Sequence, residues 1–233
     1  MSRKRFTALI IAASTLASCT TPPKTSTAPH PSAQLGTVSP AYPAGARLAD
    51  GTEVIEAIPT AELSTTEPLP MDAAKPCTGM PAEVVTPAGV TTTPVLNGAF
   101  GCVWQGSNLA VEIGVQPDPM VKEVEEHVAM ANGGSTDQLA HLAWLRIDGH
   151  YAIERILEFD PTKSCWLSLD VSSPAALNVA VYRIDSTGEP AKSDTETSVN
   201  KRCPIARKIA RNLLDHLDGD APGWWETVIH PTG

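Results

Sequence analysis

The sequence predicts an α+β domain, in which an antiparallel sheet of about five or six strands packs with two or three helices and is held by two disulfides. Several short segments alternate apolar and polar residues with a period of two and are joined by turn residues, as in antiparallel sheets. Two longer segments instead repeat apolar residues every three or four positions, which is typical of amphipathic helices. Short turns between strands, with helices between and after them, favour the α+β class.

The first part of this pattern lies between residues 80 and 116. A short helical segment is expected at residues 81–85. Residues 100–104 and 109–115 then alternate in the manner of strands, and Gly106, Ser107 and Asn108 between them supply turn chemistry. These two strands are predicted to form a hairpin.

A helix is predicted next, over residues 118–131. Asp118 and Pro119 suit the N-cap and the first helical position, and Asn132 to Gly134 end the helix. The apolar residues at helical spacing are Val121, Val124, Val128 and Ala131. Glu123, Glu125 and Glu126 are expected on the solvated face, and His127 at the edge of the core or in solvent.

The strongest hairpin signal of the chain joins residues 141–147 to residues 150–159 through Asp148 and Gly149, a pair that suits a type I′ turn. Two further strands are predicted at residues 165–171 and 177–181. A last helix is predicted from Pro204 to Leu217, with an apolar residue at every fourth position. We expect the helices to cover one face of the sheet.

The N-terminal residues predict an export signal that ends in a lipidation site. Arg3, Lys4 and Arg5 precede an apolar run over residues 6–16, which is too short to span a bilayer. Small residues and Cys19 follow in the sequence Leu-Ala-Ser-Cys, so residues 1–18 are expected to be removed and Cys19 to be diacylated. The alternative is an ordinary signal peptide that a cysteine follows by chance.

Composition divides the remainder into a tether, residues 19–70, and a domain, residues 71–233. More than half of residues 20–70 are Pro, Ser, Thr or Ala, which offer little apolar surface to offset the entropy of ordering. This composition suits an O-glycosylated stalk or an unmodified linker equally. Residues 53–58 are more apolar and are a candidate for docking on the domain.

The net charge excludes one class of partner. The chain carries −9, and removal of the three cations of the signal leaves −12. A nucleic-acid-binding protein needs a basic face, so no nucleic acid is expected as a partner. An acidic domain is also repelled by anionic lipids, so contact with the membrane is expected only through the acyl chains on Cys19.

Four cysteines remain after Cys19, namely Cys77, Cys102, Cys165 and Cys203. An even number in an exported chain predicts two disulfides. Four cysteines permit three pairings among which the sequence does not choose, and we expect neighbours to pair, Cys77 with Cys102 and Cys165 with Cys203. No Cys-x-x-Cys pair is present, which argues against a zinc site.

Several of these motifs resemble a group of uncharacterised actinobacterial cell-envelope lipoproteins. The resemblance covers residues 71–217 and rests on Leu-Ala-Ser-Cys, the Pro/Thr-rich tether, Lys-Pro-Cys77, Gly-Cys102-Val-Trp, Ser-Cys165-Trp-Leu and the Cys203-Pro helix. More loosely, the chain is similar to the extracellular sensor domains of mycobacterial Ser/Thr kinases. The resemblance implies paired disulfides and a location on the cell membrane, and it implies no catalytic residue.

The sequence shows no motif of a hydrolase, a metal site or a phosphate-binding loop, so we expect no enzyme, no cofactor and no metal. Trp144 and Trp166 are predicted to project from the sheet face opposite the main apolar one. They are candidates for lining a groove that binds an apolar or glycan ligand, unless a helix packs on them. Trp224 and Trp225 are expected either to fold back as a lid or to extend freely.

These observations predict a membrane-anchored envelope lipoprotein that acts as a non-enzymatic binding, sensing or accessory module for an unknown envelope protein or ligand. Two alternatives stay open. A lipid or glycolipid carrier needs a deep apolar cavity, and an envelope hydrolase needs a nucleophile or metal close to a base.

Overall fold

The computed structural model describes residues 42–63, 80–97, 101–116, 119–130, 139–171 and 176–217. The predicted signal peptide, the lipidation site Cys19, the cysteine Cys77 and the tryptophans Trp224 and Trp225 lie outside these residues. Among the described residues, no helix has both the length and the apolar character needed to cross a membrane.

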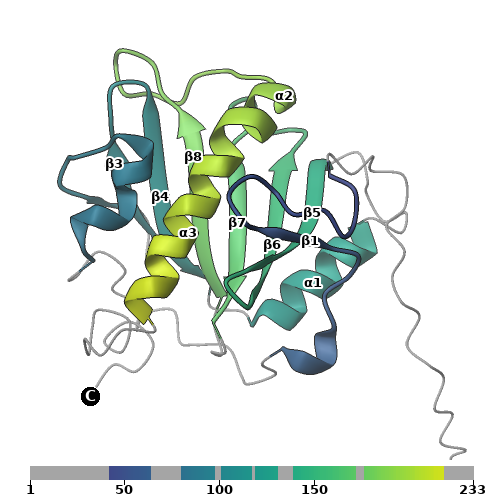
Figure 1. Ribbon diagram of the computed structural model, residues 1–233. Helices are drawn as coiled ribbons and strands as arrows, with labels where there is room; N and C mark the ends of the chain where they lie inside the picture. The colour runs from purple at the N-terminus through teal and green to yellow at the C-terminus, as the bar shows by residue number, and fades with distance from the viewer. Residues whose placement is uncertain are drawn as a thin grey trace, which may run out of the picture. The chain divides into compact units, whose positions relative to one another are not determined.

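The described strands form one antiparallel sheet in the order β1-β5-β6-β7-β8-β4-β3-β2 (Figure 1). Two meanders, β2–β3–β4 and β5–β6–β7–β8, are joined where β4 pairs with β8. The strands are β1 (Glu53–Ile55), β2 (Val95–Asn97), β3 (Gly101–Gln105), β4 (Leu109–Gln116), β5 (Leu139–Ile147), β6 (His150–Leu157), β7 (Cys165–Asp170) and β8 (Ala176–Arg183).

The α+β class and the antiparallel sheet are confirmed, but the expected strand count is wrong. The sheet has eight strands instead of five or six. The two additional strands, β1 and β2, are three residues long and lie at the two edges. A segment of three residues is too short to display a period of two, which is why the pattern did not predict them.

The β5–β6 hairpin forms where the sequence predicts it. Asp148 and Gly149 have φ of 48° and 92°, as a type I′ turn requires at both central positions. The three predicted helical segments are observed as η2 (Ala82–Ala88), α1 (Met120–Ala129) and α3 (Cys203–Leu217). Three further helical segments were not predicted: η1 (Thr60–Glu62), α2 (Thr195–Thr197) and η5 (Ser198–Arg202).

Helices lie on both faces of the sheet, so the expectation of cover on one face is wrong. Helix α3 packs its apolar side, with Ile209 and Leu213, on the larger core cluster. Helix α1 packs Met120 and Val124 on the opposite face, against residues of β5 and β6. The connection from β4 to β5 passes three intervening strands, and it carries α1 across the face opposite α3.

Residues 42–63, which we call the strap, belong to the fold although their composition places them in the tether. Strand β1 pairs with β5, and Ile58 and Leu63 are buried in the cluster on the α1 side. The docking expected for residues 53–58 is therefore observed. The folded domain extends N-terminally beyond the boundary predicted at residue 71.

One disulfide, Cys165–Cys203, is confirmed, with the two Cα atoms 5.3 Å apart. It ties the first residue of β7 to the first residue of α3, so the helix begins against the sheet. The second expected pair, Cys77–Cys102, stays a prediction, because Cys77 lies outside the described residues.

Candidate functional site

A cluster of ionisable side chains lies between the sheet and α3. We call it the ionic centre, and its members come from four elements: Tyr42 and Asp50 of the strap, His141 of β5, Glu154 of β6 and Arg207 of α3. Glu154 lies on the α3 side of β6 because its neighbours at i±2, Ala152 and Ile156, belong to the core under α3. Glu154 thus occupies a position of β6 at which the period of two predicts an apolar core residue.

Arg207 is the hub of the ionic centre. Its Nη1 donates to Glu154 Oε2 at 2.5 Å and to the Tyr42 hydroxyl at 3.3 Å, and its Nε donates to Asp50 Oδ2 at 2.7 Å. His141 Nε2 donates to the other oxygen of Glu154 at 2.9 Å. Both carboxylate oxygens of Glu154 are therefore engaged.

The proton affinities in the ionic centre follow from burial and from these contacts. Burial, and then the charge of Glu154, raise the pKa of Tyr42 to about 12. Burial alone would raise the pKa of Asp50, but hydrogen bonds from Arg207 and Thr52 lower it. Burial disfavours the charged form of Arg207, and Glu154 and Asp50 outweigh it, so the pKa of Arg207 is raised. Arg207 and Asp50 are accordingly both ionised at neutral pH.

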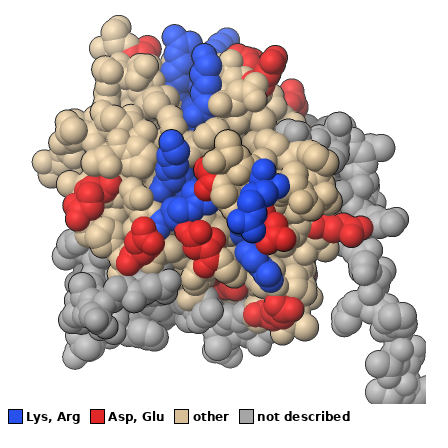
Figure 2. Space-filling view, viewed as in Figure 1, with Lys and Arg blue, Asp and Glu red and all other residues tan. Residues whose placement is uncertain are grey.

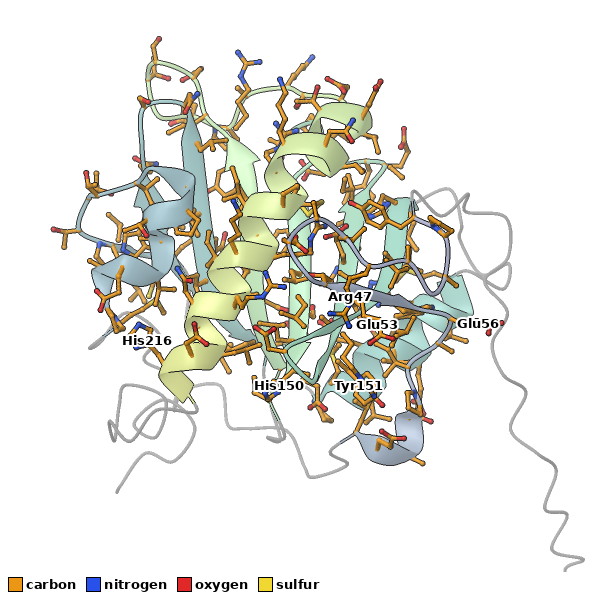
Figure 3. All side chains as sticks on the ribbon, in the orientation of Figure 1. Arg47, Glu53, Glu56, His150, Tyr151 and His216 are labelled. Atoms are coloured by element: carbon orange, nitrogen blue, oxygen red, sulfur yellow. A yellow bond between two sulfur atoms is a disulfide. The ribbon has the colours of Figure 1, made fainter. Side chains whose placement is uncertain are left out.

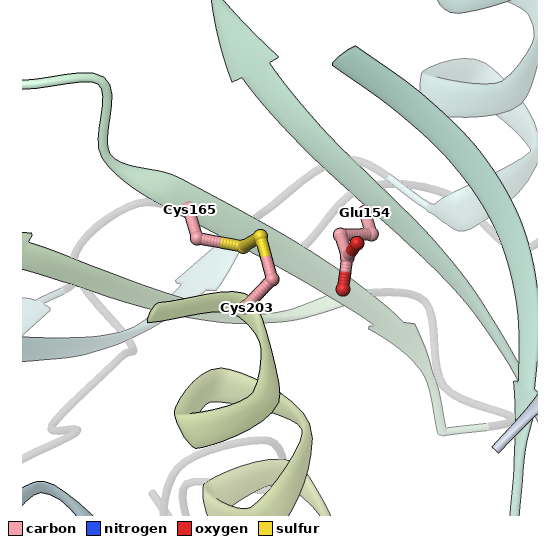
Figure 4. Close-up of side chains that lie close together, drawn as sticks. All are labelled: Glu154, Cys165 and Cys203. Carbon is pink, nitrogen blue, oxygen red and sulfur yellow. A yellow bond between two sulfur atoms is a disulfide. The ribbon is translucent and has the colours of Figure 1, made fainter. Parts of the chain in front are cut away.

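The pair of His141 and Glu154 has the contact expected of a catalytic base and its orienting carboxylate, but it is closed to substrate. The side chains are 2% and 0% exposed, and Arg207 lies on the remaining carboxylate oxygen. Glu154 also lies within 4.8 Å of the sulfurs of Cys165 and Cys203, which are bonded to each other (Figure 4). Neither sulfur is a thiolate, so this arrangement holds neither a nucleophile nor a metal-binding pair.

The other described histidines and the surface charges add no second centre of this kind on the α3 side. Figure 3 places His216 at the C-terminal end of α3 and His150 at the beginning of β6. On the face seen in Figure 2, basic and acidic side chains are interspersed. Arg211, for example, lies 3.0 Å from Asp148.

A second polar system crosses the opposite face of the sheet. We call it the polar row; it runs from Glu123 of α1 through Arg155 of β6, Ser168 of β7 and Asn178 of β8 to Gln116 of β4. Arg155 Nη1 donates to Glu123 at 3.0 Å and to Ser168 at 2.8 Å. Ser168 donates to Asn178 Oδ1 at 2.6 Å, and Asn178 Nδ2 donates to Gln116 Oε1 at 3.4 Å. Each hydrogen bond fixes the orientation of the next side chain.

The polar row corrects one expectation about α1. Glu123 was expected on the solvated face, but it is buried, with 4% of its surface exposed. Its carboxylate faces the sheet because Arg155 lies there and supplies the opposite charge. Glu125 and Glu126 are exposed, as expected.

His127, one turn after Glu123, is expected to make stability depend on pH. Burial, and then the nearby charge of Arg155, lower the pKa of His127, whose Nδ1 donates to the carbonyl of Glu123 at 2.7 Å. Below about pH 6.5 the unfolded chain therefore binds the proton before the folded chain does, and stability falls by at most about 1.4 kcal/mol per pH unit. Urea unfolding between about pH 7 and pH 5.5 should show this fall in the wild type and a smaller one in His127→Gln. Equal slopes would contradict the assignment.

The structure separates the two tryptophans that were expected to line a groove together. Both project from the face opposite α3, as predicted, because Trp144 is paired with Ile153 and Trp166 with Arg155. Trp144 is only 2% exposed and lies in the core cluster with residues of α1, so it lines no open groove. Trp166 lies beyond that cluster and is partly exposed.

Beyond Trp166, the same face bears a group of polar side chains around a glycine. We call this group the polar notch, after the missing side chain at its centre. Its centre is Gly114 of β4, which is partly exposed and stands beside Asn178 of β8 in the register. Glu112 and Gln116 flank Gly114 on the same side of β4, at i−2 and i+2. The side chains of Glu112, Gln116 and Asn178 are partly exposed.

Neither the ionic centre nor the polar notch was predicted from the sequence. The notch had a signal, because a glycine inside an alternating strand often marks a place where another group approaches the backbone. The ionic centre had none, because Asp50 and Arg207 are 157 residues apart in the chain.

No family model, curated protein or solved structure matches this chain. Function is therefore argued from the sequence and from the geometry of the two polar systems.

Proposed function

We propose that the protein is a lipid-anchored, extracytoplasmic binding module without catalytic activity, held to the membrane through Cys19. The export signal and the Leu-Ala-Ser-Cys sequence support the anchor, and the resemblance to actinobacterial envelope lipoproteins agrees with it. The tether between Cys19 and the strap gives the domain reach away from the lipid surface.

The polar notch is the observation that carries the binding role. Its hydrogen-bonding groups are partly exposed, and the polar row fixes the orientation of two of them, Asn178 and Gln116. Preorganised groups lose little entropy on binding, which is what a ligand site requires. A polar chain of this length, anchored in the buried pair Arg155–Glu123, makes the notch rigid.

The two alternatives have less support among the described residues. A hydrolase built on the His141–Glu154 pair would need His141 to reach substrate, and that side chain is 2% exposed. A lipid carrier would need an apolar cavity of a few hundred Å³. Between the sheet and α3, side chains such as Leu167, Val179 and Ile209 have no accessible surface, so no water-sized void touches them.

Two measurements test the proposal. Metabolic labelling with a palmitate analogue should mark the wild type and leave Cys19→Ala unmarked. A photoreactive amino acid at Gln116 should give a specific crosslinked product in intact cells, whereas the same group at Lys208, which is exposed on α3, should not. An unlabelled wild type would overturn the anchor, and equal crosslinking from both positions would overturn the binding face.

A further inference from the structure

We propose that the polar notch binds a neutral oligosaccharide. This inference rests on the proposed binding function and names the ligand class of that same face. It is carried by the arrangement of side chains across four strands, by their hydrogen-bonding capacity and by the position of Trp166.

Four residues form one register line across β8, β4, β3 and β2. Asn178 pairs with Gly114, Gly114 with Gly101, and Gly101 with Asn97. Two amides therefore stand at the ends of a line whose two central positions bear no side chain. Neighbouring strands are about 4.8 Å apart, so the amide-bearing strands are separated by about 14 Å.

The Glu112 side chain lies over Gly101, one of the two central positions of this line. Its Oε1 lies 2.8 Å from the place where a Cβ on Gly101 would stand, and its carboxylate accepts a hydrogen bond from Asn97. The space over Gly101 is thus filled by the Glu112 side chain, and the accessible backbone is that of Gly114. A ligand at Gly114 would meet Glu112 on one side and Gln116 on the other.

The hydrogen-bonding groups around Gly114 complement a polyol. Gln116 uses its Oε1 for Asn178, and among the described residues no acceptor engages the two N–H groups of its amide, which can donate to a ligand. Glu112 is an acceptor, and no ion pair joins it to any cation in the described part of the chain. A hydroxyl both donates and accepts, so adjacent sugar hydroxyls match these groups, whereas an anion would be repelled by Glu112.

The Glu112 carboxyl group can accept a hydrogen bond from a hydroxyl when ionised and can donate one when protonated. Burial raises the pKa of Glu112, and the hydrogen bond from Asn97 lowers it. Glu112 also raises the pKa of Tyr182 on β8, although burial contributes more to that shift. Neutral hydroxyl groups are compatible with both protonation states of Glu112.

Trp166 extends the site in one direction. It pairs with Ala180 of β8, and Ala180 pairs with Glu112 of β4, so Trp166 lies two strands, or about 10 Å, from the strand that bears Gly114. The apolar face of a sugar ring stacks on an indole, as other amphipathic ligand surfaces do. This separation exceeds the width of one sugar ring and suits an oligosaccharide.

The test uses soluble oligosaccharides of glucose, mannose, galactose, arabinose and N-acetylglucosamine at millimolar concentration, with spermidine as a cationic probe. Amide and indole NMR signals report binding. We expect at least one saccharide to shift the signals of Gly114, Asn178 and Trp166, and spermidine to leave them unchanged.

Gly114→Thr fills the notch and is the decisive variant. Gly114 is not among the glycines with positive φ, and threonine favours strands, so the variant should fold as well as the wild type does. We expect it to weaken saccharide binding by about tenfold or more, the loss of one well-made contact. Lys208→Thr, on the α3 side of the molecule, should bind as the wild type does.

The outcomes separate this inference from the proposed function. Saccharide binding that Gly114→Thr leaves unchanged, binding of spermidine alone, or no binding of any saccharide would overturn the oligosaccharide site. In each of these cases a specific crosslink from position 116 would still support a binding face, with a protein as its partner. Loss of the crosslink as well would overturn both.

Discussion

Replacing Arg207 with alanine should lower the free energy of unfolding by about 3–5 kcal/mol. Arg207 is 4% exposed and supplies the positive charge beside Glu154, which is 0% exposed, and beside Asp50. Removing one partner of a buried ion pair leaves the other charge without compensation in a poorly solvated place, and that penalty is large. Urea unfolding at neutral pH, followed by circular dichroism, measures the loss as a lower midpoint at unchanged slope.

Arg211, one helical turn further along α3, is the matched control. It donates to Thr52 of the same strap and lies 3.9 Å from Asp50, beyond hydrogen-bond distance, and its shorter ion pair is with Asp148. Arg211 is 22% exposed and Asp148 is 50% exposed. Exposed pairs contribute little, so Arg211→Ala should cost less than about 1 kcal/mol. The double variant Arg207→Met, Glu154→Gln should regain part of the stability that Arg207→Ala loses, because Glu154 no longer leaves a fully buried carboxylate unpaired, and only Asp50 loses its partner. Equal losses for Arg207→Ala and Arg211→Ala would show that the ionic centre is solvated.

The Arg207 variant also bears on the strap. Asp50 and Tyr42 reach the core through this guanidinium, in addition to the packing of Leu48 and Ala46 against the core cluster. We therefore expect proteolysis to cleave near residues 42–52 more readily in Arg207→Ala than in Arg211→Ala. Residues 42–52 of the strap would then loosen before β1, since β1 is held to β5 by its own pairing.

Local patterns predicted the parts of the fold whose stability is local. The β5–β6 hairpin was predicted because Asp148 and Gly149 suit a turn with positive φ, and α3 because its apolar residues recur along one side. The pairing of Cys165 with Cys203 was also expected, and it is confirmed. For the hairpin and the helix, a short stretch of sequence contains the physical cause, whereas the disulfide joins residues 38 positions apart.

The remaining features depend on residues far apart in the chain. Strands β1 and β2 are three residues long and exist only because a neighbouring strand offers its edge. Glu123 is buried because Arg155, 32 residues later, lies opposite it. The helix that covers Trp144 is placed there by the crossing from β4 to β5, which sheet order determines and periodicity does not.

The candidate site shows the same division. Alternation correctly assigned Trp144 and Trp166 to one face of the sheet. It did not tell which half of that face α1 covers, so it grouped a buried tryptophan with a partly exposed one. The polar notch lies on the half that none of the described helices covers, where Gly114 and Gly101 are neighbours only through the β3–β4 register.

Removal of the Cys165–Cys203 disulfide, as the double variant Cys165→Ala, Cys203→Ala, should cost about 4 kcal/mol. The bridge closes a loop over a sequence separation of 38 residues, and in the chain-entropy model such a loop restricts the unfolded state by about this amount. The effect is comparable to that of Arg207→Ala, but its origin differs, because the unfolded chain changes as well as the folded one. Denaturant unfolding at the same pH measures the loss of stability in the cysteine double variant and in Arg207→Ala.

The slope of the unfolding curve distinguishes the two origins. Without the bridge the unfolded chain is less compact and exposes more surface, so the slope should increase while the midpoint falls. Arg207→Ala should lower the midpoint and leave the slope unchanged, since it removes a contact that only the folded chain makes. Cys165→Ala alone should lose as much as the double variant does, because either substitution opens the loop. A double variant with the midpoint and slope of the wild type would show that the disulfide does not restrain the unfolded chain.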